Sequence, residues 1–468
     1  MATAFRVALT ATRVYTARMV VAPRPPSPTP PPPDPDLQTG LQYLRAGWFD
    51  RAEPLFRTAL ARHGERPDIL HFLAVCLSQR GAFADAEELW RKAIAKDPKE
   101  PMLSYNLGLV ARRQGRLDEA ARRFRDTIRR APNHVDARLA LASIHMDQDR
   151  HAAAERELGQ LLNDMERAEH EGRPVPKPLQ ARTRNMLGYA LYRCGQPQTA
   201  LEVLDQALAD AGDDVARRSQ IMGDRAMALA ALGNHEEAIS EAGQAADLAP
   251  EVAALHHALG FVLYHAGRPE EALGPLRRAL ELDPNFPGGH NTLALAQSAL
   301  GRRDEAVELL NEHIQRNPLD RDAVLNLSVL QIGRKAHSEA LAVLAPHLKE
   351  SPDDARALNN QGLALRGLGR FEEARRALKR AQRVASDDPF VLTNLASVLV
   401  DLGQAAEARP LHEQALQGLP GDPRLLANYG ICLAALGERD RARDVLDASL
   451  ASDPNNEEAL VARANLDT

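Results

Sequence analysis

Aromatic residues, cysteines and long apolar runs are scarce in this sequence, and neither sign of charge dominates it. Aromatic side chains make up 4% of the 468 residues. Alanine and leucine are abundant, and such small or straight-chain residues favour helices that pack closely along their backbones. With 58 basic and 64 acidic residues, the net charge of −6 gives no global attraction to nucleic acid or to an anionic membrane. The composition therefore favours an all-helical protein that does not bind nucleic acid.

The few cysteines and the short apolar runs exclude several classes of protein. Cys76, Cys194 and Cys432 are far apart and form no CxxC pair, so they indicate neither a disulfide framework nor a zinc site. No stretch approaches the ~18 apolar residues of a membrane helix, so we expect no membrane insertion. Residues 1–21 lack acids, but arginines interrupt them, which fails the signal-peptide pattern. We expect a cytoplasmic protein, with an organelle-type presequence as the alternative.

A repeat of 34 residues is the dominant feature of the chain. In frames that begin at Pro101 and extend both ways, position 20 is alanine in all twelve frames. Position 8 is Gly or Ala except at Ser328, and position 15 is Gly except at Asp149 and Lys335. The alanines are Ala52, Ala86, Ala120, Ala154, Ala200, Ala238, Ala272, Ala306, Ala340, Ala374, Ala408 and Ala442.

Each of these positions has a physical role in a pair of helices. Small residues at positions 8 and 20 let the two helices approach to the short end of the ~8–10 Å packing range. A glycine at position 15 suits the left-handed residue that ends the first helix. Proline near position 32, as in Asp97-Pro98, ends the second helix because it cannot donate the next hydrogen bond. One pair cannot bury its apolar faces alone, so neighbouring pairs must stack.

The pattern resembles the tetratricopeptide repeat (TPR), a Gly in the first helix followed by A-x3-F and Pro; in the Pro101 frame these are Gly108, Ala120, Phe124 and Pro132. The resemblance implies a right-handed superhelix of about twelve helix-turn-helix repeats. We expect a disordered N-terminus with a proline-rich linker at 1–35, repeats 1–4 at 36–168, repeat 5 at 181–214, repeats 6–12 at 219–456 and a capping helix at 457–468. Proline-bearing residues 169–180 are predicted to form an insertion loop. We expect residues 215–468 to fold without the first five repeats.

Motifs that carry chemistry are missing. The sequence contains no GxxxxGK[ST], GxGxxG, GxSxG or HExxH motif. The twelve frames leave no room for a catalytic domain between residues 33 and 456. We therefore predict a protein that is not an enzyme and has no cofactor, no metal and no catalytic residue.

Asparagine recurs at position 6 in four consecutive frames, as Asn326, Asn360, Asn394 and Asn428. In TPR proteins positions 2, 5, 6, 9, 12 and 13 face the inner groove, as the resemblance implies. The four asparagines resemble the ladder in the TPR superhelix of O-linked N-acetylglucosamine transferase, which grips a peptide backbone. An amide offers both a donor and an acceptor, so it can bind any peptide group. We expect these side chains to be exposed and to bind a partner; the alternative is that they only pack the repeats.

Three further residues are candidates for partner binding. Asn106 has the same repeat position as the ladder but stands alone, and Arg112 and Arg113 would face the groove within an arginine-rich frame. A solvated basic face is one interpretation of these arginines, and the binding of an acidic partner segment is the other. The carboxylate clamp of chaperone-binding TPR domains is not expected, because only Arg356, Arg366 and Arg424 could contribute to it.

The sequence thus predicts a non-enzymatic scaffold that binds extended segments of other proteins or peptides. One alternative is a targeting or assembly subunit that works with a separate glycosyltransferase or with polysaccharide or secretion machinery. RNA binding is a weaker hypothesis, because RNA-reading helical repeats place base-reading side chains at fixed positions. Weak homo-oligomers through the terminal repeats are a further option.

Overall fold

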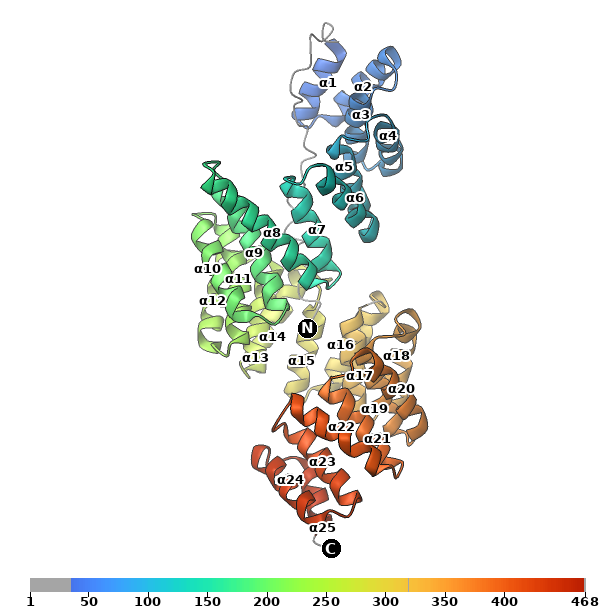
Figure 1. Cartoon of the computed structure of the whole chain (residues 1–468). Coiled ribbons are helices and arrows are strands. Elements are labelled where there is room, and N and C mark those ends of the chain that lie inside the picture. Colours follow the sequence, from blue (N-terminus) through green and yellow to red (C-terminus); the bar gives the residue numbers. More distant parts are fainter. Residues whose placement is uncertain (1–34, 319, 467–468) are drawn as a thin grey trace. The chain divides into compact units, whose positions relative to one another are not determined.

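The computed structural model describes residues 35–318 and 320–466, and every regular element in these ranges is an α-helix. Consecutive helices pair into hairpins, as Figure 1 shows. The predicted all-α array of helix-turn-helix repeats is therefore confirmed. Residues 1–34, which include the predicted proline-rich linker, lie outside the described residues.

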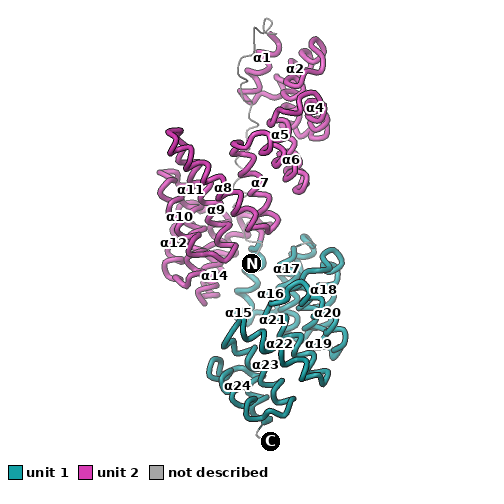
Figure 2. The backbone as a smooth tube through the Cα atoms, viewed as in Figure 1, with its two compact units in different colours: residues 1, 288–468 teal, residues 2–287 magenta. Residues whose placement is uncertain are grey.

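The chain divides into two compact units, which meet between Pro287 and Gly288 (Figure 2). The described part of the first, here the N-terminal unit, contains α1 (Pro35–Arg45), α2 (Phe49–His63), α3 (Pro67–Gln79), α4 (Phe83–Lys96), α5 (Pro101–Arg113), α6 (Leu117–Arg130), α7 (Val135–Asp147), α8 (His151–His170), α9 (Lys177–Arg193), α10 (Pro197–Asp210), α11 (Val215–Ala231), α12 (His235–Leu248), α13 (Ala253–His265) and α14 (Pro269–Leu282).

The second, here the C-terminal unit, contains α15 (Gly289–Ala299), α16 (Arg303–Arg316), α17 (Arg321–Gly333), α18 (His337–Glu350), α19 (Ala355–Gly367), α20 (Phe371–Val384), α21 (Pro389–Asp401), α22 (Ala405–Gly418), α23 (Pro423–Ala435), α24 (Arg439–Ser452) and α25 (Glu457–Leu466). The division falls inside the predicted array of repeats 6–12, and the sequence pattern does not mark it.

The two insertions mostly lengthen helices. α8 continues to His170 and α9 already begins at Lys177, so the connection is shorter than the predicted loop at 169–180. Proline stops neither helix, because Pro178 lies in the first turn of α9, where no backbone donor is needed. The four extra residues from Val215 likewise form the first turn of α11. One hydrophobic cluster joins Leu158, Leu204 and Ile221, so the core continues across both insertions.

Close approach of the two helices of a repeat depends on position 8 and on the side chain at position 24. A Cβ added at Gly362 would lie 2.4 Å from Leu378 Cγ, and one added at Gly108 would lie 2.7 Å from Phe124 Cε1. All twelve alanines at position 20 are fully buried. In the repeats with glycine at position 8, the large side chain at position 24 therefore fills the space that the glycine leaves open.

The turn between the helices of each repeat uses a left-handed residue at position 15. All ten glycines there have positive φ, for example 75° at Gly115 and 73° at Gly369. The two exceptions have the same conformation, with φ of 56° at Asp149 and 61° at Lys335. Since left-handed backbone costs a residue with a Cβ roughly 1–2 kcal/mol, the fold imposes this turn even where the sequence disfavours it.

First helices of neighbouring repeats also contact each other. In the C-terminal unit α15, α17, α19, α21, α23 and α25 form one such series. In the N-terminal unit α9, α11 and α13 form another. These odd-numbered helices make up the inner layer of each unit, and their side chains at positions 5, 6, 9 and 12 define what we call the inner face.

The last helix, at the position of the predicted capping helix, exposes both acidic and apolar side chains. α25 begins with Glu457 and Glu458, but Leu460 and Val461 are exposed. Among the helices of the described residues, none has the length and apolar character needed to cross a bilayer.

The first prediction uses the turn at position 15. Lys335→Gly should stabilise the protein by up to about 1 kcal/mol, because glycine adopts a positive φ without a Cβ penalty. Gly369→Ala, at the same position one repeat later, should destabilise it by about 1–2 kcal/mol. Chemical denaturation of both variants measures the changes. If both variants changed the free energy of unfolding in the same direction and by the same amount, the claim that the fold imposes a left-handed residue at position 15 would be contradicted.

The second prediction concerns the C-terminal unit. Residues 288–468 should give a helical, cooperatively melting fragment, because each described hydrophobic cluster lies within one unit. Circular dichroism and sedimentation test this. The fragment 215–468, which the repeat pattern predicts to fold, is the comparison. Because it cuts the cluster that joins Leu204 to Ile221, we now expect it to melt less cooperatively and to self-associate more than 288–468. An unfolded 288–468 fragment would contradict the division.

Candidate functional site

The four ladder asparagines lie on consecutive inner helices of the C-terminal unit. Asn326 is on α17, Asn360 on α19, Asn394 on α21 and Asn428 on α23. The structure therefore brings them into one row, as the repeat spacing predicted. Whether they bind a partner stays a prediction.

Each of the first three side-chain amides hydrogen-bonds to the preceding repeat. Asn326 Nδ2 donates to Asn291 Oδ1 at 3.3 Å, and Asn394 Nδ2 donates to Asn359 Oδ1 at 2.9 Å. Asn360 Nδ2 donates to Ser328 Oγ at 2.9 Å. Ser328 is the single exception to the Gly or Ala of position 8, and its hydroxyl also donates to the Leu325 carbonyl. The asparagine amides thus join one repeat to the next.

Asn428 is bonded differently. Its Oδ1 accepts a hydrogen bond from Ser397 Oγ at 2.9 Å, and its Nδ2 donates to the Arg424 carbonyl at 2.9 Å. Both ends of this amide already have partners, whereas the other three asparagines have one free end.

The expectation that the ladder is exposed in the free protein was wrong. Asn360 is only 8% exposed, and the other three are half-buried. Packing against the preceding repeat covers them, and loss of an inter-repeat hydrogen bond should cost roughly 0.5–1.5 kcal/mol. These residues therefore contribute to stability whatever else they do.

The carbonyl oxygens of the ladder remain open. In the described part of the chain, Oδ1 of Asn326, Asn360 and Asn394 accepts no hydrogen bond, and none of the three is among the buried atoms without a partner. These oxygens are thus not fully buried and can accept a hydrogen bond from a ligand.

Uncharged side chains lie around these oxygens. Val329 on α17 is 54% exposed, and Ile332, Leu363, Val400 and Ile431 are half-buried at positions 9 and 12 of their repeats. The row therefore combines backbone-compatible acceptors with apolar contact surface.

Asn106 does not belong to this row. It lies on α5 of the N-terminal unit, is fully buried, and neither of its side-chain polar atoms has a hydrogen-bond partner. Nothing outside the chain can contact it in this structure, so the structure does not support its predicted role.

The two candidate arginines have different surroundings. Arg112 Nη2 donates to Ser143 Oγ at 2.7 Å and lies 3.8 Å from Asp147 Oδ2. Burial lowers the pKa of Arg112, and Asp147 opposes this shift. Arg113 is exposed at the end of α5. Arg112 therefore bridges α5 and α7, and the two do not form one anion site.

Two of the three arginines considered for a carboxylate clamp are engaged with other side chains. Arg366 pairs with Asp401, and Arg424 lies over the Phe390 ring at 5.1 Å from its centre. Arg366 and Arg424 are therefore less available to the carboxylate of a ligand, and the absence of a clamp stays a prediction.

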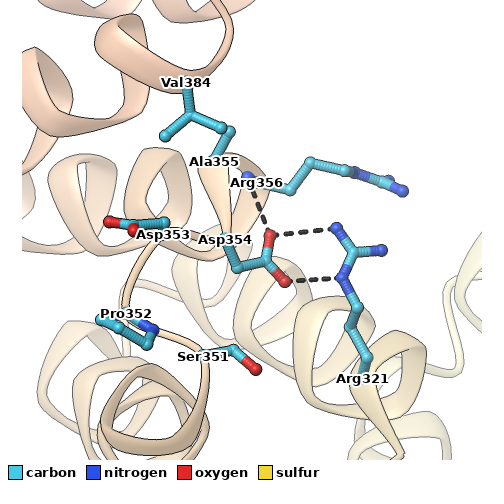
Figure 3. Close-up of a pocket in the computed structure, with 8 residues that line it drawn as sticks. All are labelled: Arg321, Ser351, Pro352, Asp353, Asp354, Ala355, Arg356 and Val384. Atoms are coloured by element: carbon cyan, nitrogen blue, oxygen red, sulfur yellow. Dashed lines mark hydrogen bonds and ion pairs between the residues drawn. The ribbon is translucent and has the colours of Figure 1, made fainter. Parts of the chain in front are cut away.

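A shallow depression of about 550 Å³ lies at the start of α19 (Figure 3). Its central carboxylate, Asp354, accepts hydrogen bonds from Arg321 Nη2 and His347 Nε2, both at 2.9 Å, and from the Ala357 amide. Burial alone would raise the pKa of Asp354, but these bonds outweigh it and lower the pKa to about 2. The same pairing recurs one repeat earlier between His313 and Asp320. The depression is a junction between repeats in which the charge of the central carboxylate is satisfied internally.

One cluster escaped the sequence analysis. Asp224 occupies position 6 of its frame, like the ladder asparagines, and lies on α11 beside Asn185 and Tyr189 of α9. The sequence could have revealed Asp224, because an acidic residue at position 6 is as unusual in these frames as the run of asparagines. The sequence analysis missed it because the insertions that lengthen α9 and α11 interrupt the 34-residue period in this part of the chain.

No chemistry of metals or activated thiols is apparent in the described ranges. No group of three or more His, Cys, Asp or Glu side chains there could hold a metal ion. Burial raises the pKa of the Cys76 thiol to about 12 and that of Cys432 to about 11, so neither is an activated nucleophile.

Three solved structures illustrate the likeness to known proteins. A tetratricopeptide repeat protein from Parabacteroides merdae is 18% identical and covers 53% of this chain and 99% of its own, with a TM-score of 0.45. The Cut9–Hcn1 hetero-tetramer of APC/C is 14% identical and covers 91% of this chain and 95% of its own, with a TM-score of 0.46. Yeast Tom70 is 15% identical and covers 92% of this chain and 94% of its own, with a TM-score of 0.45. No curated protein matches the chain.

Family models of the tetratricopeptide repeat match the chain in both units. One matches residues 37–101, 105–165, 185–253 and 224–287; a second matches 299–363 and 399–466; a third matches 355–388. Together they cover well over half of the sequence, in the same ranges that contain the helix pairs. The chain belongs to the tetratricopeptide repeat family.

Proposed function

We propose that the protein is a non-catalytic scaffold whose C-terminal unit binds an extended segment of a partner protein along its inner face. The observation that carries this proposal is the row of three open carbonyl oxygens on Asn326, Asn360 and Asn394, each at the same position of its repeat. Family membership supports it, because stacked repeats of this type form extended binding surfaces.

The spacing of the row suits a peptide backbone. Helical repeats that stack at roughly 10 Å present one oxygen per repeat. An extended peptide rises about 3.3 Å per residue, so every third backbone N–H can meet an oxygen. One N–H of each asparagine amide already binds the preceding repeat, whereas the carbonyl oxygen accepts no bond, so we expect the partner to act mainly as the hydrogen-bond donor.

Apolar contacts supply the rest of the affinity. Val329, Ile332, Leu363 and Val400 lie beside the row and carry no charge. Because no ion pair is needed, the binding should depend only weakly on salt. The partner segment is thus an extended peptide with apolar side chains, and its sequence is read mainly by these contacts.

The third prediction tests the apolar contacts. Peptides of nine residues, selected from a random displayed library on the full-length protein, serve as the ligand. Val329→Ser should weaken their binding by about 1–2 kcal/mol, because an exposed apolar contact is lost. Val384→Ser is the matched control, since Val384 is 53% exposed but lies on the second helix of a repeat. If both variants bind like the wild type in isothermal titration, the inner face is not the site.

The fourth prediction separates binding from packing. Asn394→Ala removes both the open oxygen and the bond to Asn359, whereas Asn359→Ala removes that bond and keeps the oxygen. Both variants should lose about 0.5–1.5 kcal/mol of stability. Asn394→Ala should also lose about 0.5–1.5 kcal/mol of peptide binding. Asn359→Ala, which lies at position 5 of the inner face but keeps the open oxygen, should lose less. Equal losses of binding in the two variants would mean that the ladder acts through packing alone.

A further inference from the structure

The inner layer of the N-terminal unit contains a buried carboxylate without a cation. Asp224 on α11 is 5% exposed, and its Oδ2 accepts no hydrogen bond from any described residue. The amide of Asn185 on α9 bonds to this carboxyl group, but Asn185 Oδ1 is itself buried and lacks a partner. Two hydrogen-bond acceptors are thus left open side by side.

The residues of α9 around this carboxylate do not neutralise it. Tyr189 is buried and Tyr192 is half-buried, and both are close enough for the Asp224 charge to contribute to their raised pKa, after burial as the main cause. A cation on the same helix as these tyrosines is Arg193, whose Nη1 donates to Tyr189 Oη at 2.6 Å and whose Nη2 lies 3.7 Å from Asp149 Oδ1. Arg193 is therefore engaged elsewhere.

The other neighbouring elements do not supply a counter-charge either. On α11 itself, Arg225 pairs with Asp205 and Glu241. α13 packs against α11 through Leu255, and the titratable residue of that helix nearest in register, His257, is buried with its ring against Phe286. No ion pair joins Asp224 to any residue of the described ranges.

This arrangement costs stability in the free protein. Burial raises the pKa of Asp224 well above its ordinary value, and the bond to Asn185 only partly opposes the shift. A buried carboxyl group without a counter-charge is unfavourable unless something compensates it. The raised pKa means that this carboxyl group stays protonated to a higher pH in the free protein, and a partner group that donates hydrogen bonds and carries positive charge would compensate its ionised form.

We propose that Asn185, Tyr189, Tyr192 and Asp224, here the Asp224 site, bind an arginine side chain of a partner polypeptide on the inner face of the N-terminal unit. Both open groups are acceptors, and a guanidinium offers five donors in a planar fork. Arg193 already lies over the buried Tyr189 ring at 5.7 Å, so the half-buried Tyr192 is the ring that can stack on that plane. The long aliphatic stem of arginine can reach Asp224, which is 5% exposed, once the side chains that cover its Oδ2 move aside. An acidic or neutral side chain would leave the carboxylate uncompensated.

The site lies in a different unit from the asparagine row and has the opposite chemistry. Charge recognition dominates here, whereas apolar and backbone contacts dominate in the C-terminal unit. A partner of two segments, one basic and one apolar, would engage both. The inference about Asp224 does not depend on the function proposed for the C-terminal unit.

A matched pair of libraries provides the probe. Nine-residue displayed peptides with arginine fixed at the centre, and the same library with glutamine fixed there, are selected on the full-length protein. The strongest arginine peptide is then synthesised with arginine and with citrulline, which has nearly the same shape but no charge. We expect citrulline to lower the affinity at least tenfold in isothermal titration, and we expect the glutamine library to yield no comparable binder.

Substitutions locate the effect. Asp224→Asn should remove most of the arginine-to-citrulline difference, because it removes the charge and keeps an oxygen toward Asn185. Asp247→Asn makes the same charge change on the exposed surface of α12 and should behave like the wild type. Val329→Ser should also leave this binding unchanged, which separates the site from that of the C-terminal unit. An arginine preference that persists in Asp224→Asn, or no arginine preference at all, would overturn the proposal.

A stability measurement without any peptide checks the premise. Because the folded pKa of Asp224 is raised above the unfolded value of about 3.9, its ionisation destabilises the fold increasingly as the pH rises above about 4. Asp224→Asn should therefore raise the melting temperature by a few degrees at pH 8 and by less at pH 5. Asp247→Asn should show no such pH dependence. A melting temperature of Asp224→Asn that is lower than that of the wild type at pH 8 would overturn the premise of an uncompensated charge.

Discussion

The close approach of the two helices within each repeat is the constraint on which the rest of the structure depends. Where position 8 is glycine, a single added Cβ would collide with the side chain at position 24, as at Gly362 and Leu378. Alanine at position 20 is fully buried in every repeat. Because these contacts fix the two helices against each other, every repeat presents the same positions to its neighbours. An inner face of regularly spaced side chains follows from that regularity.

The inner layer both holds the repeats together and presents the candidate sites. The amide of Asn394 binds the preceding repeat while its carbonyl stays open, so one side chain joins stability to recognition. Asp224 differs from Asn394 in that its burial without a cation lowers the stability of the free protein. Proteins often keep such locally unfavourable groups where a ligand compensates them. The two units would then use one architecture for two kinds of partner segment.

Much of the fold follows from local sequence pattern, and much of the site does not. The helix pairs and the left-handed turn residues are predictable because both depend on contacts within 34 residues. The bond from Asn360 to Ser328 joins different repeats, so no single frame reveals that the ladder is half-buried. The burial of Asn106 likewise depends on the packing of several helices. The division after Pro287 and the helical ends of the predicted insertion loop have no signal at the level of the repeat pattern.

Hydrogen–deuterium exchange of the C-terminal unit, with and without a selected peptide, tests the central claim most directly, since it locates the occupied surface without any substitution. A peptide on the inner face should slow amide exchange in α17, α19, α21 and α23 and leave α18, α20 and α22 nearly unchanged. Protection confined to the second helices, or to the junction around Asp354, would contradict the account.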